Sequence, residues 1–343
     1  MPASRDGLRI CLLTTQDLDA KPFAEDDWPC DPRPFLPDAD WHLETLVGKR
    51  ACLPVVERLV ADERFDLFFN LCDGAADQPE LPGIEVVEIL EGAGVPFVGA
   101  VSACYEPSRD RMKQACRARG IATPASATVH HERDLDRAVA ALRYPLFVKH
   151  PSSYASVDLS RRSKACSPNG LRIQVRKMIA RHGAALVEEY VDGRECTVLV
   201  VENPDDPRQP IVYPPIEYRF PPGEHFKHES LKWVDYDALA CEPVADPVLA
   251  ERLARECGEF FVELAAASFA RCDLRVDRDG VPFMLEINAN CGVYFPPTDY
   301  GSADLCIAND PGGHAAFTRT LVAAAFARHE RRSRQARRSS LIA

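Results

Sequence analysis

Short apolar runs alternate with longer polar and mixed stretches along the first 150 residues of the chain. The apolar runs have the length of buried strands and cover 8–14, 66–71 and 95–100. Helices are predicted between and after them at 43–62, 82–94 and 107–119, and glycines close the last two. Because strands that alternate with helices form βαβ units, this part predicts a parallel sheet.

The pattern changes after residue 131, where predicted strands follow one another more closely. Expected helices cover 132–143, 168–182, 246–268 and 312–330. Expected strands cover 144–150, 185–191, 194–201 and both arms of a hairpin at 270–288. A polar loop at 151–166 and a proline-rich stretch at 203–225 separate these elements. The fold class is therefore expected to be α/β, with α+β character in the C-terminal part.

The hairpin at 270–288 turns at Asp279-Gly280, a dipeptide that favours a two-residue loop between apolar strands. With that loop, Asp273 faces Glu286 across the hairpin, and Arg271 faces Asn288. Since side chains alternate between the two faces of a strand, these four residues share one face. A different loop length would shift this register.

Carboxylates that face each other repel, so a buried pair requires a cation or a raised pKa. Asp273, Glu286 and Asn288 offer only oxygen ligands, which suit Mg²⁺ carried by a phosphate-bearing substrate. The alternative is a solvated polar face on a surface hairpin. Lys149 ends an apolar strand before a serine-containing loop, which is compatible with a phosphate site or with an ordinary charge at the rim.

The composition of the chain disfavours nucleic-acid-binding, membrane-spanning and secreted proteins. A formal net charge of −11 over 343 residues disfavours nucleic-acid binding. No apolar run approaches the ~18 residues of a membrane span, and the first residues lack a secretory pattern. Thirteen scattered cysteines without metal-binding spacing indicate reduced thiols in a cytoplasmic protein. The basic stretch 331–343 is expected to be a solvated helix end that frays into a disordered tail, with a tail that binds nucleic acid or a partner as the alternative.

Six motifs follow one another in a characteristic order. They are FNLCDG at 69–74, VPFVGA at 95–100, SRDRMK at 108–113, YPLFVKHPSSYASV at 144–157, LVEEYVDGRECTV at 186–198 and RCDLRVDRDGVPFMLEINANCG at 271–292. In this order and spacing the chain resembles the ATP-grasp superfamily, within its D-alanine–D-alanine ligase-like branch. The resemblance implies three domains, at 1–103, 104–185 and 186–330, with ATP between the second and the third.

The resemblance also implies ATP and two Mg²⁺ ions as cofactors, with Mn²⁺ as an alternative metal. Asp273, Glu286 and Asn288 match the metal ligands. The residues that match contacts to ATP are Arg109, Lys149, Ser156, Glu188, Tyr190, Val191, Glu195, Lys232 and Leu285. In this set, Arg109 and Lys149 match phosphate ligands, with Lys113 as the alternative to Arg109. Glu188, Tyr190 and Val191 match the adenine hinge. Glu195 matches the ribose contact, and Leu285 would pack on adenine.

For catalysis, Arg271 and the backbone N–H of Gly292 match the groups that stabilise an oxyanion, and Lys232 matches a lysine of a mobile loop. Residues expected to handle the substrates are Asp73, Trp233, Asn290 and Tyr294. Asp73 stands where the family has a histidine and Trp233 where it has a tyrosine. These departures favour a ligase for another small-molecule carboxylate and amine. An authentic D-alanine–D-alanine ligase and a non-catalytic ATP-binding regulatory protein are the alternatives, and a homodimer is typical of the branch.

Overall fold

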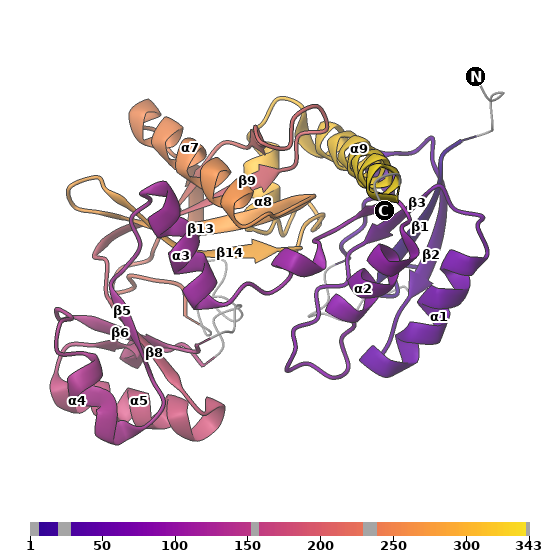
Figure 1. Ribbon diagram of the computed structural model, residues 1–343. Helices are drawn as coiled ribbons and strands as arrows, with labels where there is room; N and C mark the ends of the chain where they lie inside the picture. Colours follow the sequence, from indigo (N-terminus) through magenta and orange to yellow (C-terminus); the bar gives the residue numbers. More distant parts are fainter. Residues whose placement is uncertain (1–6, 20–28, 152–157, 229–238, 341–343) are drawn as a thin grey trace.

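The computed structural model describes residues 7–19, 29–151, 158–228 and 239–340, which form three lobes, each with its own sheet (Figure 1). The first sheet is parallel, whereas the second and third are antiparallel. Short 3₁₀ helices lie at Arg33–Phe35, Ser102–Cys104, Glu132–Asp134 and Arg161–Ser163. The expected α/β class with an antiparallel C-terminal part is confirmed.

The N-terminal sheet has the strand order β2-β1-β3-β4. These strands are β1 (Arg9–Thr14), β2 (Asp40–Thr45), β3 (Leu67–Asn70) and β4 (Phe97–Val98), and helices α1 (Lys49–Ala61) and α2 (Ile84–Ala93) pack on one face. The predicted parallel sheet is confirmed. The helix predicted at 43–62 is wrong at its start, because residues 40–45 pair with β1 as an edge strand and α1 begins only after Gly48.

The middle sheet has the strand order β5-β8-β6-β7. Its strands are β5 (Ser126–Val129), β6 (Leu146–Lys149), β7 (Lys164–Ala165) and β8 (Ala185–Glu189), and helices α4 (Leu135–Ala138) and α5 (Pro168–His182) cover it. The helix predicted at 132–143 is too long: residues Glu132–Asp134 form a 3₁₀ helix, and α4 ends at Ala138. Because β8 belongs to this sheet, the domain boundary predicted at residue 185 lies inside a strand, and the middle lobe extends to Glu189.

The C-terminal sheet has the order β12-β11-β9-β13-β14, with β10 also paired to β9. Its strands are β9 (Gly193–Val201), β10 (Ile211–Val212), β11 (Ile216–Arg219), β12 (Ala240–Pro243), β13 (Phe269–Asp277) and β14 (Pro282–Ala289). Helices α3 (Arg109–Arg119) and α7 (Pro247–Glu263) pack on one face, and α8 (Ser302–Ala308) with α9 (Gly313–Ser340) on the other. This sheet carries most of the candidate site.

Alternation along β9 and β13 explains where the site lies. Even-numbered residues of both strands, such as Val198 and Cys272, are buried in the cluster that includes α7. Odd-numbered residues divide into two groups. The first group is apolar and packs with α8 and α9; it consists of Leu199, Val201 and Phe269. Further along the same face, the odd-numbered residues become polar or charged, at positions 195, 197, 271, 273 and 275. The polar half of this face is therefore available for chemistry.

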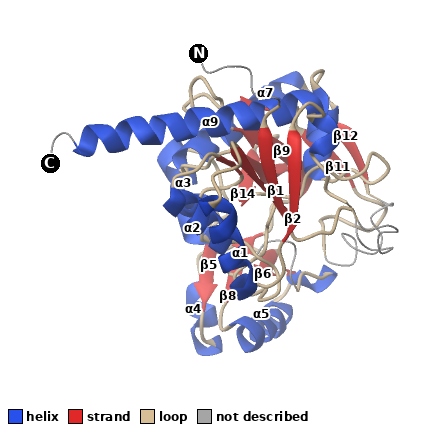
Figure 2. Cartoon of the chain, turned by 90° about the vertical axis from the view of Figure 1, so that its right-hand side faces the viewer, coloured by secondary structure: helices blue, strands red, loops and turns tan. Residues whose placement is uncertain are grey.

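Helix α9 packs against both the C-terminal sheet and the N-terminal lobe, and its last turns project from the molecule (Figure 2). The disorder expected for 331–343 is wrong for residues 331–340, because α9 continues to Ser340. Arg331 bonds to Glu202 at 2.6 Å and Arg332 to Glu91 at 3.0 Å, which fixes the first projecting turn. Within the described part of the chain, no helix combines the length and hydropathy of a membrane span.

Candidate functional site

The hairpin of β13 and β14 brings the predicted metal ligands together. Asp273 pairs with Glu286 and Arg271 with Asn288, as the sequence predicts. The loop, however, spans residues 278–280 instead of two residues, and its Gly280 has a φ of 78°. A bulge beside Asp273 offsets this extra residue. The two irregularities cancel, so the expected pairing is confirmed although the expected loop is wrong.

Asp273 is the most heavily bonded residue of the candidate metal set. Its carboxylate accepts hydrogen bonds from Thr197 Oγ1 at 2.8 Å, from Arg271 Nη2 at 2.9 Å and from Asn288 Nδ2 at 3.0 Å. Burial disfavours the charged form, but Arg271 and Lys227 outweigh it and hold the Asp273 pKa well below its usual range. The carboxylate is thus ionised, and Arg271 balances its charge.

Glu286, on the neighbouring strand, is held by Arg109. The guanidinium Nη1 forms an ion pair with the Glu286 carboxylate and also donates to the Leu285 carbonyl at 3.3 Å. Arg109 comes from α3 and is 7% exposed, so this cation is aimed into the site and not into solvent. The structure therefore brings the predicted phosphate ligand and the predicted metal ligand into contact.

A second cationic group lies where the middle lobe meets the C-terminal lobe. Glu188 Oε1 is 2.7 Å from Lys113 Nζ, and Oε2 is 2.6 Å from Lys149 Nζ. Burial raises the Glu188 pKa, but the two lysines outweigh it and lower the pKa to about 2. Lys113 and Lys149 therefore both reach the site, whereas the adenine contact of Glu188 stays a prediction.

The segment 190–195 connects the two lobes, and Arg275 fixes it. This guanidinium donates to the carbonyls of Val191 and Gly193 at 2.6 and 2.9 Å. It also reaches the Tyr190 hydroxyl at 3.1 Å and the Glu195 carboxylate at 2.9 Å. The residues that match adenine and ribose contacts are thereby held by one buried arginine of β13.

The donor set suits a hard divalent cation. Asp273 and Glu286 supply carboxylate oxygens and Asn288 an amide oxygen, the ligand types that Mg²⁺ prefers. The described residues contain no group of three or more His, Cys, Asp or Glu that would form a metal site on their own. A metal at this set would consequently require further oxygens, which the phosphates of a nucleotide could supply.

The structure does not place all predicted substrate residues around this group. Asn290 Nδ2 donates to the Cys72 carbonyl at 2.8 Å, tying the end of β14 to the N-terminal lobe. Tyr294 is 2% exposed, and its hydroxyl lies 2.9 Å from Thr318 Oγ1 in the core. Asp73 is exposed beyond the end of β3. A side chain at Gly292 would crowd the Phe295 ring. Ser156, Lys232 and Trp233 lie outside the described residues.

Sequence reasoning missed three residues that the structure places in the site: Thr197, Lys227 and Arg275. Arg275 continues the two-residue alternation of 271 and 273, so the period of the strand is a signal that could have found it. Thr197 faces Asp273 from the adjacent strand, a pairing that only the sheet order reveals. Lys227 comes from the loop that precedes the expected Lys232.

Comparisons with known proteins show which family the chain belongs to. The family model described as the D-ala D-ala ligase C-terminus matches residues 118–295. The D-alanine–D-alanine ligase of Cupriavidus necator is 26% identical over 60% of this chain, which spans 61% of that relative's length. An uncharacterized protein of Sinorhizobium fredii, y4sG, is 30% identical over 73% of this chain and 74% of its own length.

Solved structures share the fold over nearly the whole chain. The D-alanine–D-alanine ligase of Bacillus anthracis complexed with ATP matches with a TM-score of 0.68 and 16% identity, over 95% of this chain and 100% of that one. The D-alanine–D-alanine ligase of Coxiella burnetii matches with a TM-score of 0.71 and 15% identity, over 98% of this chain and 99% of that one. At these identities the likeness shows the fold, and the expected ATP-grasp architecture is confirmed.

Proposed function

Because the chain belongs to the D-ala D-ala ligase C-terminus family, we propose that it is an ATP-dependent ligase that joins a carboxylate to an amine. The reaction would form ADP and an acyl phosphate, which the amine converts to an amide with release of phosphate. The observation that carries the proposal is the ion pair of Arg109 with Glu286 of the hairpin, beside Lys113 and Lys149, which both pair with Glu188.

These cations suit the triphosphate of ATP. Arg109 and Lys149 are buried and lie where phosphate oxygens would replace or share their present carboxylate partners. Asp273, Glu286 and Asn288 would hold Mg²⁺, which when bound neutralises charge on the β- and γ-phosphates. A solved relative carries ATP, which supports the same ligand here.

Arg271 would stabilise the oxyanion that forms when the amine attacks the acyl phosphate. Its guanidinium is already oriented by two bonds to Asp273, at 3.1 and 2.9 Å, so little reorganisation is required. The backbone N–H of Gly292 would be the second donor. A donor of this kind contributes on the order of 3 kcal/mol to comparable reactions.

The substrates are proposed to be a small carboxylate and a small amine, and the departures at Asp73 and Trp233 favour substrates other than D-alanine. A true D-alanine–D-alanine ligase is the alternative within the same reaction class. The alternative from another class is a regulatory protein that binds ATP without turnover. Incubation with ATP, Mg²⁺ and D-alanine alone identifies a true D-alanine–D-alanine ligase. Incubation with pooled amino acids or acids separates a ligase, which releases phosphate in a pool-dependent way, from a protein that binds ATP without turnover.

Glu286→Gln tests the site assignment. The substitution keeps the side chain's size but removes one negative metal ligand, so ADP formation should fall at least 100-fold while the protein stays folded, if one lost transition-state interaction costs about 3 kcal/mol. Glu242→Gln is the matched control, since its carboxylate is 58% exposed and pairs with Arg219 away from the site. Undiminished turnover by Glu286→Gln would contradict the metal assignment.

A further inference from the structure

Both carboxylate oxygens of Glu195, the residue that matches a ribose contact, already have cationic partners. Oε2 accepts from Arg275 Nη1 at 2.9 Å, and Oε1 lies 3.5 Å from Lys227 Nζ. The Glu195 side chain is 8% exposed, so it has little access to water. Release of one of the two cations would leave a whole carboxylate oxygen to the ribose hydroxyls.

The two cations are held very differently. Arg275 is fixed by further bonds to Val191, Gly193 and Tyr190, so moving it would break the connection between the lobes. Among the described residues, Lys227 forms one ion pair, at 3.5 Å, and its ammonium lies over the Tyr218 ring, 3.7 Å from the centroid. A lysine ammonium on a flexible stem can also be redirected at little cost. Lys227 is therefore the partner that can be exchanged.

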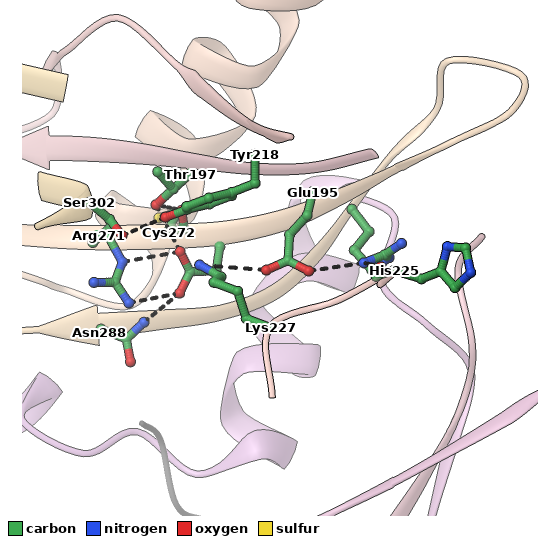
Figure 3. Close-up of polar contacts among 11 residues, drawn as sticks. Glu195, Thr197, Tyr218, His225, Lys227, Arg271, Cys272, Asn288 and Ser302 are labelled. Carbon is green, nitrogen blue, oxygen red and sulfur yellow. Dashed lines mark hydrogen bonds and ion pairs between the residues drawn. The ribbon is translucent and has the colours of Figure 1, made fainter. Parts of the chain in front are cut away.

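Lys227 also lies between the two ends of the proposed nucleotide site. In Figure 3 its side chain reaches into the space between Glu195 and the group formed by Arg271 and Asn288. Burial lowers the Lys227 pKa, but Tyr218, Asp273 and Glu195 outweigh it and raise the pKa. The ammonium thus feels negative charge from the ribose end and from the metal end, and it is charged near neutral pH.

We propose that Lys227 is a nucleotide-phosphate ligand, which moves from Glu195 to the phosphate next to the ribose when ATP or ADP binds. The proposal rests on the proposed function, because it places the ribose at Glu195 and the metal-bound phosphates at the hairpin. Between those two groups lies the α-phosphate. One movement then neutralises this phosphate and releases Glu195 Oε1 for the ribose hydroxyls.

The exchange is favourable because the ammonium keeps an anionic partner throughout. A charge-assisted bond to phosphate replaces one to carboxylate, and neither state leaves a buried cation unpaired. Nucleosides without phosphate lack the new partner, so they must compete with Lys227 for Glu195. Lys227 is therefore expected to favour nucleotides over nucleosides.

Titration calorimetry of Lys227→Met with ATP, ADP and adenosine tests this role. The Kd values for ATP and ADP should rise about tenfold, equivalent to about 1.4 kcal/mol, because one charge-assisted bond is lost. The Kd for adenosine should stay the same or fall, because Glu195 Oε1 is no longer occupied. Lys177→Met is the matched control, since its partner Asp158 lies in the middle lobe, and all three of its Kd values should equal those of the wild type.

Lys227→Gln provides a second variant that retains a polar head group, and its thermal unfolding shows whether the fold is intact. Equal weakening of ATP, ADP and adenosine in both variants would mean that Lys227 only supports packing, and this would overturn the proposal. Unchanged affinities for all three would overturn it as well. A wild-type protein that binds neither ATP nor ADP would instead contradict the proposed function itself.

Discussion

Glu188→Gln should destabilise the protein strongly, because one carboxylate neutralises two buried lysines. Lys113 and Lys149 are 7% and 8% exposed and lie 2.7 and 2.6 Å from its oxygens. Removing one partner of a buried pair typically costs about 3–5 kcal/mol, because an uncompensated charge remains. Burial already lowers the Lys149 pKa, so its deprotonation relieves part of this cost. We expect a loss of about 3 kcal/mol.

Urea unfolding at pH 7 measures this loss. With a slope of about 3 kcal/mol per molar urea, the midpoint should fall by about 1 M. Glu189→Gln is the matched control: its partner Arg143 is 87% exposed, and such pairs contribute about 0–1 kcal/mol. Adding Lys113→Met to Glu188→Gln should recover part of the loss. Equal midpoints for the Glu188 and Glu189 variants would refute the reasoning.

At acidic pH, the free energies of unfolding of the wild type and of Glu188→Gln should become equal. The folded-state pKa of Glu188 is about 2, below its ordinary value of 4.5. A lowered pKa contributes stability that is complete above the unfolded pKa and lost as pH falls toward the folded one. The stability deficit of the variant should therefore be constant near neutrality and shrink between about pH 4.5 and pH 2.

Two further substitutions test how the N-terminal lobe is attached and folded. Gly74→Ala should lower the free energy of unfolding by about 1–3 kcal/mol, because a Cβ at this position would overlap the carbonyl oxygen of Leu81. Thermal unfolding measures this loss, and an unchanged unfolding temperature would contradict the close approach. Asn290→Ala should cost about 1 kcal/mol, since the buried carbonyl of Cys72 loses one of its two donors and keeps only the Tyr105 hydroxyl. Hydrogen exchange should rise mainly after β3, and uniform protection would argue against a tie between the lobes.

The hairpin shows how far the sequence determines the site. Its face assignment depends on the two-residue period of strands, which is a local property, and this part of the prediction is confirmed. The loop length was wrong by one residue, yet the bulge beside Asp273 restores the pairing. The alternation of apolar and polar residues does not reveal this bulge, in which Leu285 of β14 has no partner on β13.

Other errors arise where distant segments decide the outcome. Residues 40–45 form a strand because β1 offers an open edge, although the following residues are helical. Tyr294 follows Gly292 closely and was expected at the substrate, but packing with Phe69 and Phe317 places it in the core. In each case the local pattern is compatible with two environments, and long-range packing selects one.

The central claim is that this chain couples ATP cleavage to amide formation. The most direct measurement is phosphate release and product mass in reactions that contain ATP, Mg²⁺ and pools of carboxylates and amines, with each pool also tested alone. The account predicts phosphate release that requires both a carboxylate and an amine, an amide product in equal amount, and neither with Glu286→Gln. ATP binding without turnover in any pool, or phosphate release that needs no amine, would contradict it.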